Sequence, residues 1–349
     1  MSRAARVFVG VPTLNRPDYV RETVQSVLSQ SFGDIRVVVS DNRSTPEVVS
    51  SVKAFLAELR DPRVSFHEQP TDVGEFGQGW YFFREAREEF FVILHDDDTL
   101  EPDYLAKAIA TLESRPHVAF FLANPFVMDW QGELQLELTR EYLAEHGRTR
   151  RPAGEFDLLA GLFDPGTAWL SGTCFRLAAL RDSGFADDDC AGHYLEFNVF
   201  LRLAERHCKG WFEPEQLMGL RFHRESLRVY CGWNPQIVAN TTRLLERRRF
   251  EGRPERQRRA MLGFLYRAAG LQALDVGDSR AARAAFIKAL KAYPWSPGAW
   301  RTAGLGLLAP RLLQRLKPLT ETRLAATTAG AREGVVQTTP QVTRGGSTA

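Results

Sequence analysis

Three kinds of feature are absent or scarce in this sequence. None of its four cysteines stands in a Cys-x-x-Cys pair, which argues against a zinc site of the usual spacing and against a disulfide-dense secreted scaffold. No stretch approaches the roughly 18 consecutive apolar residues of a membrane-spanning helix, and no apolar signal segment follows Met1. A formal net charge of +2 lacks the basic excess of most nucleic-acid-binding proteins. We therefore expect a cytoplasmic protein with reduced thiols and no nucleic-acid partner.

The composition is that of a large globular protein. The chain has 349 residues, of which 44% are hydrophobic and 25% charged, so it can bury a sizeable core. This length favours one large domain with a smaller appendage. From the changes of pattern along the chain we expect a main domain over residues 1–235, a helical region over 236–318 and a disordered tail over 319–349.

Short β-branched runs alternate with helical patterns in the first hundred residues. The expected strands are residues 6–11, 35–40, 64–67 and 90–94, and the expected helices are 16–30, 46–59 and 79–87. This alternation predicts a Rossmann-like, doubly wound α/β sheet with parallel crossovers. Ligands of such sheets bind at the carboxyl ends of the strands. The residues just after Val11, Val39 and Leu94 are therefore the first candidates for a functional site.

The sharpest local feature is a run of one histidine and three aspartates at residues 95–98, directly after an apolar strand. Three adjacent carboxylates repel one another unless a cation or solvent screens them, and carboxylate oxygens suit Mg²⁺ or Mn²⁺. The other interpretation is an acidic turn in which Asp98 or Thr99 caps the next helix. The run by itself leaves both interpretations open.

Several short motifs, in order, resemble family 2 of the glycosyltransferases, which are inverting enzymes with the GT-A fold. Residues 11–16 (Val-Pro-Thr-Leu-Asn-Arg) and 24–30 (Val-Gln-Ser-Val-Leu-Ser-Gln) resemble the family's first strand and helix, and residues 37–44 (Val-Val-Val-Ser-Asp-Asn-Arg-Ser) resemble its second strand. The likeness covers about residues 6–230. It implies a GT-A catalytic domain, a nucleotide diphosphate sugar as donor, with a UDP-sugar favoured, and Mn²⁺ or Mg²⁺ as cofactor.

The resemblance implies a nucleotide-binding role for four residues at the ends of the first two strands. They are Thr13, Asn15, Arg16 and Asp41. A turn hydroxyl at Thr13 and a helix N-cap at Asp41 are the alternatives. The Asp-Val-Gly segment at 72–74 is expected to approach the same site, with a glycine that permits close passage of the backbone.

The acidic run falls on the metal motif of the family. Asp96 and Asp98 are the preferred metal ligands, in an Asp-x-Asp pattern, and Asp96 and Asp97 also fall where the family contacts the donor. His95 is expected to be an orienting or core residue and not a metal ligand. Which carboxylate touches the metal stays open at this stage.

A catalytic base is the next requirement, because an acceptor hydroxyl is a weak nucleophile at neutral pH and needs a carboxylate to take its proton. Residues 193–203 (His-Tyr-Leu-Glu-Phe-Asn-Val-Phe-Leu-Arg-Leu) resemble the family's catalytic helix, and this register places Glu196 on the catalytic aspartate. An exposed glutamate that favours the helix dipole is the alternative. Asp188 and Asp189 are reserve candidates, and residues 169–176 resemble the stretch that frames the acceptor pocket.

A further segment, residues 221–226 (Arg-Phe-His-Arg-Glu-Ser), resembles the family's Arg-x-His-x-x-Ser motif. The resemblance implies that His223 completes the metal shell or contacts the diphosphate, and that Arg221 or Arg224 neutralises phosphate charge. A structural histidine is the alternative.

The C-terminal part begins with a basic stretch. Residues 243–259 hold eight arginines against three glutamates, which indicates either a solvated helical connector or a patch that approaches anionic lipid or a lipid-linked acceptor. Residues 261–300 then follow the pattern of paired helices with a turn at Gly277 and Asp278, similar to one tetratricopeptide hairpin.

The sequence thus predicts transfer of a sugar, with inversion, to a hydroxyl of a glycan or lipid-linked acceptor in cell-surface polysaccharide synthesis, with peripheral contact at the inner face of the membrane. The alternative is a non-catalytic nucleotide-sugar-binding or scaffold protein on the same fold. A nucleotidyltransferase ranks last, because residues 12–16 lack the Gly-rich basic loop typical of that class.

Overall fold

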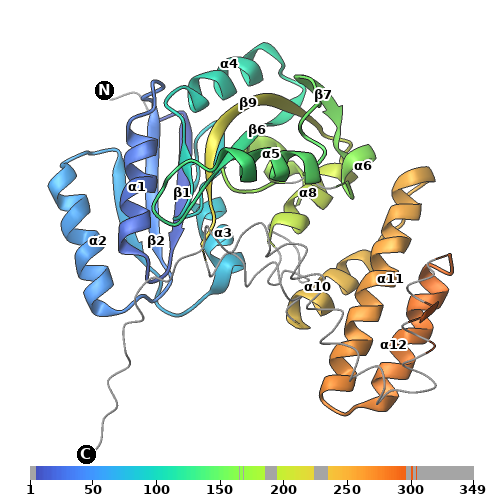
Figure 1. Cartoon of the computed structure of the whole chain (residues 1–349). Coiled ribbons are helices and arrows are strands. Elements are labelled where there is room, and N and C mark those ends of the chain that lie inside the picture. The colour runs from blue at the N-terminus through green and yellow to red at the C-terminus, as the bar shows by residue number, and fades with distance from the viewer. Residues whose placement is uncertain are drawn as a thin grey trace, which may run out of the picture.

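The computed structural model describes residues 5–164, 166–167, 169–184, 195–223, 235–295, 300–301 and 304. Its centre is a mixed, mostly parallel sheet with helices on both faces (Figure 1). The strands of the described part are β1 (Val7–Thr13), β2 (Ile35–Asp41), β3 (Val64–Glu68), β4 (Phe90–Ile93), β5 (Thr99–Leu100), β6 (Val118–Met128), β7 (Gly154–Asp157), β8 (Cys174–Arg176) and β9 (Lys209–Arg221).

The sheet has two halves of different character. Its order is β3-β2-β1-β4-β8-β6-β9-β5, with β7 paired to β9. The first four strands are all parallel, as the alternating pattern predicts. In the second half, β8 runs antiparallel to β4 and β6, and β5 and β7 run antiparallel to β9. The predicted doubly wound, mostly parallel sheet is confirmed, and the carboxyl ends of β1, β2 and β4 meet at one edge.

The described helices of the main domain include counterparts of the three expected at 16–30, 46–59 and 79–87. They are α1 (Pro17–Leu28), α2 (Pro46–Leu59), α3 (Gly74–Glu85), α4 (Tyr104–Ser114), α5 (Leu136–Glu145), α6 (Leu158–Gly161), α7 (Leu177–Asp182) and α8 (Leu195–Glu205). Both α1 and α2 start with proline in the first turn, where its missing N–H costs no hydrogen bond. The predicted helix at 79–87 starts five residues earlier, at Gly74.

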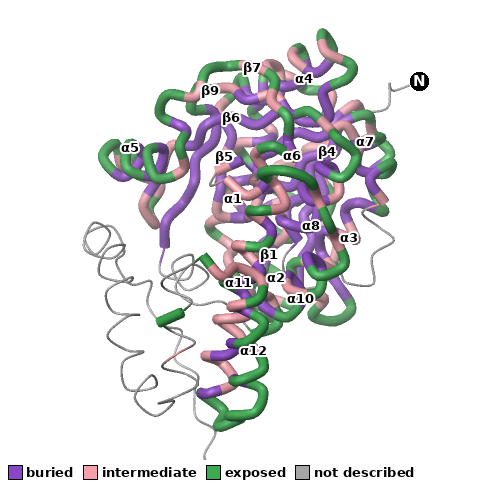
Figure 2. The backbone as a smooth tube through the Cα atoms, turned by 90° about the vertical axis from the view of Figure 1, so that its right-hand side faces the viewer, coloured by how far each residue is buried: buried purple, intermediate pink, exposed green. Residues whose placement is uncertain are grey.

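Side chains of the central strands alternate between two cores. On β1, Val7, Val9 and Val11 face a core shared with α1, α2, α4 and α5, whereas Phe8 faces a second core shared with α3, α7 and α8. A Cβ atom at Gly10 would come within 2.5 Å of a ring carbon of Phe82 on α3, so this glycine lets α3 pack closely against the sheet. Figure 2 shows the buried strands enclosed by helices with exposed outer faces.

The predicted C-terminal helices are present as α10 (Pro235–Glu246), α11 (Gly252–Asp275) and α12 (Ser279–Ala292), which extend away from the sheet in Figure 1. Asp278 caps α12 by accepting a hydrogen bond from the Ala281 N–H. Arg253 and Gln257 of α11 bond to Asp164 beside α6 at 2.8 and 2.7 Å. The helices are therefore tied to the side of the sheet that carries α6 and α8.

The second core continues into these helices. Val238, Leu245 and Leu262 belong to it, so α10 and the first half of α11 pack with the sheet beyond the expected boundary at residue 235, and the three-part division stays a prediction. No helix among the described residues combines the length and apolarity that crossing a bilayer requires. The expected tail at 319–349 lies outside the described residues.

Candidate active site

The acidic run forms a tight loop at the carboxyl edge of the central strands. Asp96 is held by the last residue of β1, since the Thr13 hydroxyl donates to its carboxylate at 2.8 Å, and Arg16 donates to its other oxygen at 3.1 Å. The Thr23 hydroxyl of α1 lies 2.8 Å from both the Asp96 and the Asp98 carbonyl oxygens. The buried loop is therefore anchored to β1 and α1.

Asp97 lies between the basic side chains of Arg16 and His223. Its carboxylate accepts from Arg16 at 3.1 Å and contacts the ring of His223 at 2.8 Å. Burial opposes ionisation of Asp97, but the hydrogen bond to His223 and the charge of Arg16 outweigh it and lower the pKa of this carboxyl. Asp97 is thus the carboxylate of the loop that most readily carries a full negative charge.

Its two neighbours ionise less readily. Burial, followed by the charge of Asp97, raises the pKa of Asp96 to about 6 and that of Asp98 to about 7. Asp98 accepts from the Ser171 hydroxyl at 2.5 Å and from the Arg221 backbone N–H at 3.3 Å. The alternative that Asp98 or Thr99 caps the next helix is wrong, because α4 begins at Tyr104 with Asp103 in the N-cap position.

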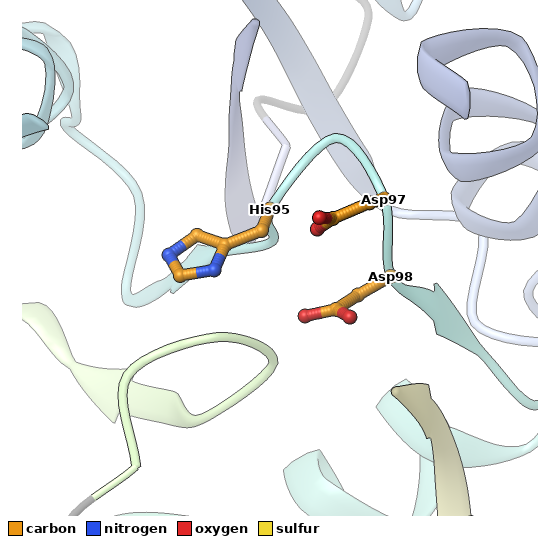
Figure 3. Close-up of side chains that lie close together, drawn as sticks. All are labelled: His95, Asp97 and Asp98. Atoms are coloured by element: carbon orange, nitrogen blue, oxygen red, sulfur yellow. The ribbon is translucent and has the colours of Figure 1, made fainter. Parts of the chain in front are cut away.

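One group of side chains in the described part of the chain could hold a metal ion. His95, Asp97 and Asp98 each offer a ligand atom, and these atoms lie within 4.8 Å of one another. Figure 3 shows both aspartates pointing toward the His95 side of the turn. Burial alone would lower the pKa of His95, but the charges of Asp98 and Asp97 raise it. Carboxylate oxygens suit Mn²⁺ and Mg²⁺, so the two aspartates of this group fit the expected cofactor.

This group differs from the predicted metal ligands. Asp98 belongs to both sets. The Asp96 carboxylate instead accepts hydrogen bonds from Thr13 and Arg16, and the His223 ring contacts Asp97. The structure instead brings in His95, to which the sequence argument gave an orienting role. The assignment of Asp96 and His223 to the metal stays a prediction.

Arg221 has a structural use that the sequence did not reveal. Its side chain is almost fully buried; it donates to the Asp97 carbonyl at 3.0 Å and to the Trp130 carbonyl at 3.3 Å, and it pairs with Glu22. In this structure the guanidinium therefore holds the acidic loop from behind. Its predicted contact with phosphate stays a prediction, and Arg224 lies outside the described residues.

Asp41, at the end of β2, has a buried carboxylate oxygen without a hydrogen-bond partner among the described residues. Asp41 is 2% exposed; one carboxylate oxygen accepts from the Ser44 N–H at 2.9 Å, and the other is buried without a hydrogen-bond partner in the described residues. A buried acceptor without a partner is costly unless a ligand supplies the donor. Nearby, the Asn15 side chain accepts from the Thr45 N–H at 2.9 Å, which fixes the loop after β1 to the start of α2.

Glu196 lies in the first turn of α8 and is only partly exposed. Its carboxylate accepts from the Leu170 N–H at 3.0 Å. Burial, despite that hydrogen bond, raises the pKa of Glu196 to about 7. A carboxyl with such a pKa exchanges a proton at neutral pH, as a general base requires. The reserve candidates Asp188 and Asp189 lie outside the described residues.

A short segment, residues 169–173, joins the two acidic sites. At Leu170 its backbone holds Glu196, and at the next residue the Ser171 hydroxyl donates to Asp98 and accepts from the His95 N–H at 3.1 Å. Gly172 follows with φ +73, a conformation that favours glycine. The sequence argument placed this segment at the acceptor pocket but did not identify Ser171 as a contact, because no spacing rule links it to residue 98.

Comparison with known families agrees with this arrangement. Residues 8–167 match the family model described as glycosyl transferase family 2. The chain is 25% identical over 128 residues to a protein of Escherichia coli named putative colanic acid biosynthesis glycosyl transferase WcaA, covering 37% of this chain and 44% of that one. It is 29% identical over 116 residues to the Campylobacter jejuni GalNAc(5)-diNAcBac-PP-undecaprenol beta-1,3-glucosyltransferase, covering 33% and 36%. Residues 8–167, just under half of the chain, are therefore similar to glycosyl transferase family 2.

Solved structures share the fold. Staphylococcus aureus TarS matches with a TM-score of 0.53 at 16% identity, over 91% of this chain and 54% of that one. The mannosyltransferase PcManGT from Pyrobaculum calidifontis, solved with GDP-Man and Mn²⁺, matches with a TM-score of 0.53 at 18% identity, over 95% and 88%. The fold is therefore GT-A, with helices at the C-terminal end. The chain spans less than half the length of the two curated relatives named above.

Proposed function

We propose that this chain is an inverting, metal-dependent glycosyltransferase that moves a sugar from a nucleotide diphosphate sugar to a hydroxyl of a glycan or lipid-linked acceptor in polysaccharide synthesis. The observation that carries the proposal is the pairing of two acidic sites through residues 169–173. One site offers His95, Asp97 and Asp98 at the strand ends, and the other offers Glu196 with a pKa raised to about 7.

The donor side follows from the first site. His95, Asp97 and Asp98 would hold Mn²⁺ or Mg²⁺, which when bound would neutralise charge on the departing nucleotide diphosphate. Thr13 and Arg16 keep Asp96 in place, and Asp41 presents a buried oxygen that can accept from a nucleotide hydroxyl or base N–H. A UDP-sugar is our preferred donor from the sequence, whereas PcManGT was solved with GDP-Man, so the base is the first property to measure.

The acceptor side follows from Glu196. We assign it the role of general base: its ionised carboxylate takes the proton of the acceptor hydroxyl as that oxygen attacks the sugar carbon. The Leu170 N–H holds one carboxylate oxygen at 3.0 Å and leaves the other for the acceptor. One curated relative is named for an undecaprenol-linked substrate, which supports a lipid-linked acceptor and work at the inner face of the membrane.

The test is a screen of nucleotide diphosphate sugars with Mn²⁺ and Mg²⁺, read both as thermal stabilisation and as nucleotide release with lipid-linked and free glycan acceptors. We expect one donor to stabilise the protein only with the cation present and to be turned over with one acceptor class. Stabilisation without release or transfer would favour the non-catalytic alternative. Absence of stabilisation by every donor would contradict the proposal.

A further inference from the structure

A second polar site lies far along the chain from the acidic loop. The helices α10, α11 and α12 enclose a pocket of about 440 Å³. Five basic side chains line it: Arg249, Arg258, Arg259, Lys288 and Lys291. The only acidic side chain in the lining is Glu246. The matched family region ends at residue 167, and the proposed transfer reaction does not use these helices, so the pocket needs its own explanation.

Two of the five cations have carboxylate partners. Arg258, only 4% exposed, pairs with Glu255 at 2.6 Å, and Lys288 lies 3.4 Å from Glu246. These two pairs cancel four of the charges around the pocket. The remaining charge around the pocket comes from the other three basic side chains.

The other three cations form no ion pair with a carboxylate among the described residues, although the charge of Arg249 also acts on Glu255. Arg249 donates to the carbonyls of Glu246 and Arg248, and Arg259 donates to the carbonyls of Lys291 and Ala292. Backbone carbonyls satisfy N–H groups but leave the positive charge uncancelled. Lys291 is exposed, and its side chain has no described hydrogen bond. Three uncompensated positive charges therefore face one pocket, and guanidinium groups match phosphate oxygens in geometry.

Exposed apolar side chains lie next to the pocket. Ile287 is 44% exposed and precedes Lys291 by one helical turn, so both lie on the same side of α12. Trp295, three residues beyond the pocket residue Ala292, is 84% exposed. Tryptophan beside lysine and arginine is typical of surfaces that rest on a membrane, where the ring lies at the headgroup level.

We infer that the pocket between α10, α11 and α12 binds the phosphate headgroup of an anionic membrane lipid, with Arg249, Arg259 and Lys291 as the phosphate-facing cations and Trp295 at the lipid surface. The basic stretch at 243–259, which the sequence left as either a connector or a lipid-facing patch, then serves both purposes. This inference does not depend on the transfer reaction. A protein without transferase activity would show the same binding.

The experiment is co-sedimentation of the full chain with phosphatidylcholine vesicles, with and without phosphatidylglycerol. We expect binding only to the anionic vesicles, weakened by salt. Arg259→Gln with Lys291→Gln should weaken it by about 30-fold, since each basic residue near an anionic surface contributes roughly fivefold. Lys291→Glu is the second variant, because it removes no described hydrogen bond and should fold even if the loss of Arg259 disturbs the end of α12.

The matched control is Arg280→Gln with Arg283→Gln, which removes two exposed charges from α12 outside the pocket. The inference requires this control to bind within about twofold of the parent, well under the roughly fivefold contribution of one facing charge. An equal loss in both double variants would overturn it, because attraction would then be diffuse. Lack of vesicle binding would also overturn it, including the case in which inorganic pyrophosphate alone stabilises the protein.

Discussion

The two acidic sites of the candidate active site are held in very different ways. The loop at 95–98 is fixed by β1, α1, β9 and residue 171, through side-chain and backbone hydrogen bonds on all three aspartates. The Glu196 carboxylate accepts one hydrogen bond, from the Leu170 N–H, among the described residues. We conclude that the donor side is pre-organised, whereas the acceptor side depends on a single backbone contact. The following changes test that contrast, from the largest expected effect to the smallest.

Asp98→Asn should have the largest effect. It removes a charge from the proposed cation site while the amide oxygen can still accept from Ser171, so folding should persist. We expect kcat/KM to fall by about 1000-fold or more, since charge stabilisation at the leaving group is worth several kcal/mol. Cation-dependent donor binding, measured by calorimetry, should be lost as well.

Asp103→Asn is the matched control for this change, because Asp103 is exposed and its side chain bonds only to the Ser31 hydroxyl in the described residues. It should leave both kcat/KM and donor binding unchanged. Retention of cation-dependent donor binding in Asp98→Asn would contradict the assignment of the donor side.

Glu196→Gln should lower kcat by about 100-fold or more, the typical worth of a general base. Because the amide oxygen can still accept from Leu170, the helix should stay in place. Donor affinity should remain within about twofold, the scatter expected where no contact is lost. Glu205→Gln, on the same helix and far along it from residue 196, serves as the control. Weakened donor binding in Glu196→Gln would contradict the assignment of donor binding and proton transfer to two separate sites.

The pH dependence of the parent enzyme, measured at saturating cation, should report Glu196, because a bound cation would keep Asp98 ionised although burial raises its pKa to about 7 as well. A base must be ionised, and burial raises the pKa of Glu196 to about 7, so the rate should fall about tenfold per pH unit below that value and level off above it. The same shift has a stability consequence. The ordinary pKa of a glutamate is 4.5, whereas that of Glu196 is about 7. Ionisation of Glu196 therefore destabilises the folded state as the pH rises through this range.

Glu196→Gln should therefore melt at a higher temperature than the parent at pH 8, and the difference should shrink toward pH 4.5. Calorimetric melting curves across this range measure it. A rate that stays flat between pH 6 and 8, together with equal melting temperatures, would remove Glu196 from the role of base.

Asp41→Asn should raise the KM for the donor by about tenfold, the worth of one hydrogen bond to a charged group, with little change in kcat. The Asn oxygen can keep the bond to the Ser44 N–H, so the effect should come from the buried oxygen that has no partner in the described residues. Initial rates over a range of donor concentrations separate KM from kcat. A fall in kcat alone would place Asp41 outside the nucleotide site.

Ser171→Ala should have the smallest effect, about fivefold on kcat, through loss of one hydrogen bond to Asp98. The effects of Ser171→Ala and Glu196→Gln on kcat should not be additive when the two changes are combined, because both act through residues 169–173. A double-mutant cycle on kcat measures this. Strict additivity would mean that the segment does not connect the two sites.

The parallel half of the sheet was predictable and the mixed half was not. β-branched runs predicted β1 and β2, helical spacing predicted α1 and α2, and the bounds of α2 agree to the residue. By contrast, β8 has three residues, too few for a period to show, and β6 pairs with β9 through register shifts near Asn124. Short strands placed by distant partners leave no local pattern in the sequence.

The candidate site divides in a similar way. The position after a strand indicated the acidic run, and the resemblance to the family's catalytic helix indicated Glu196, because strand ends and motif order are local properties. The sequence did not group His95 with Asp97 and Asp98, since the direction of side chains in a tight turn depends on contacts such as that between Thr13 and Asp96. It also gave no sign that Arg221 is buried behind the loop. The contact between Arg221 and Asp97 joins residues 124 positions apart.

The most direct test of the central claim is a crystal structure of Glu196→Gln with the donor found in the screen and Mn²⁺, using anomalous scattering to locate the metal. The account predicts manganese at His95, Asp97 and Asp98, with the diphosphate beside it and residue 196 facing the sugar. Manganese and nucleotide bound elsewhere, with the loop at 95–98 empty, would contradict it.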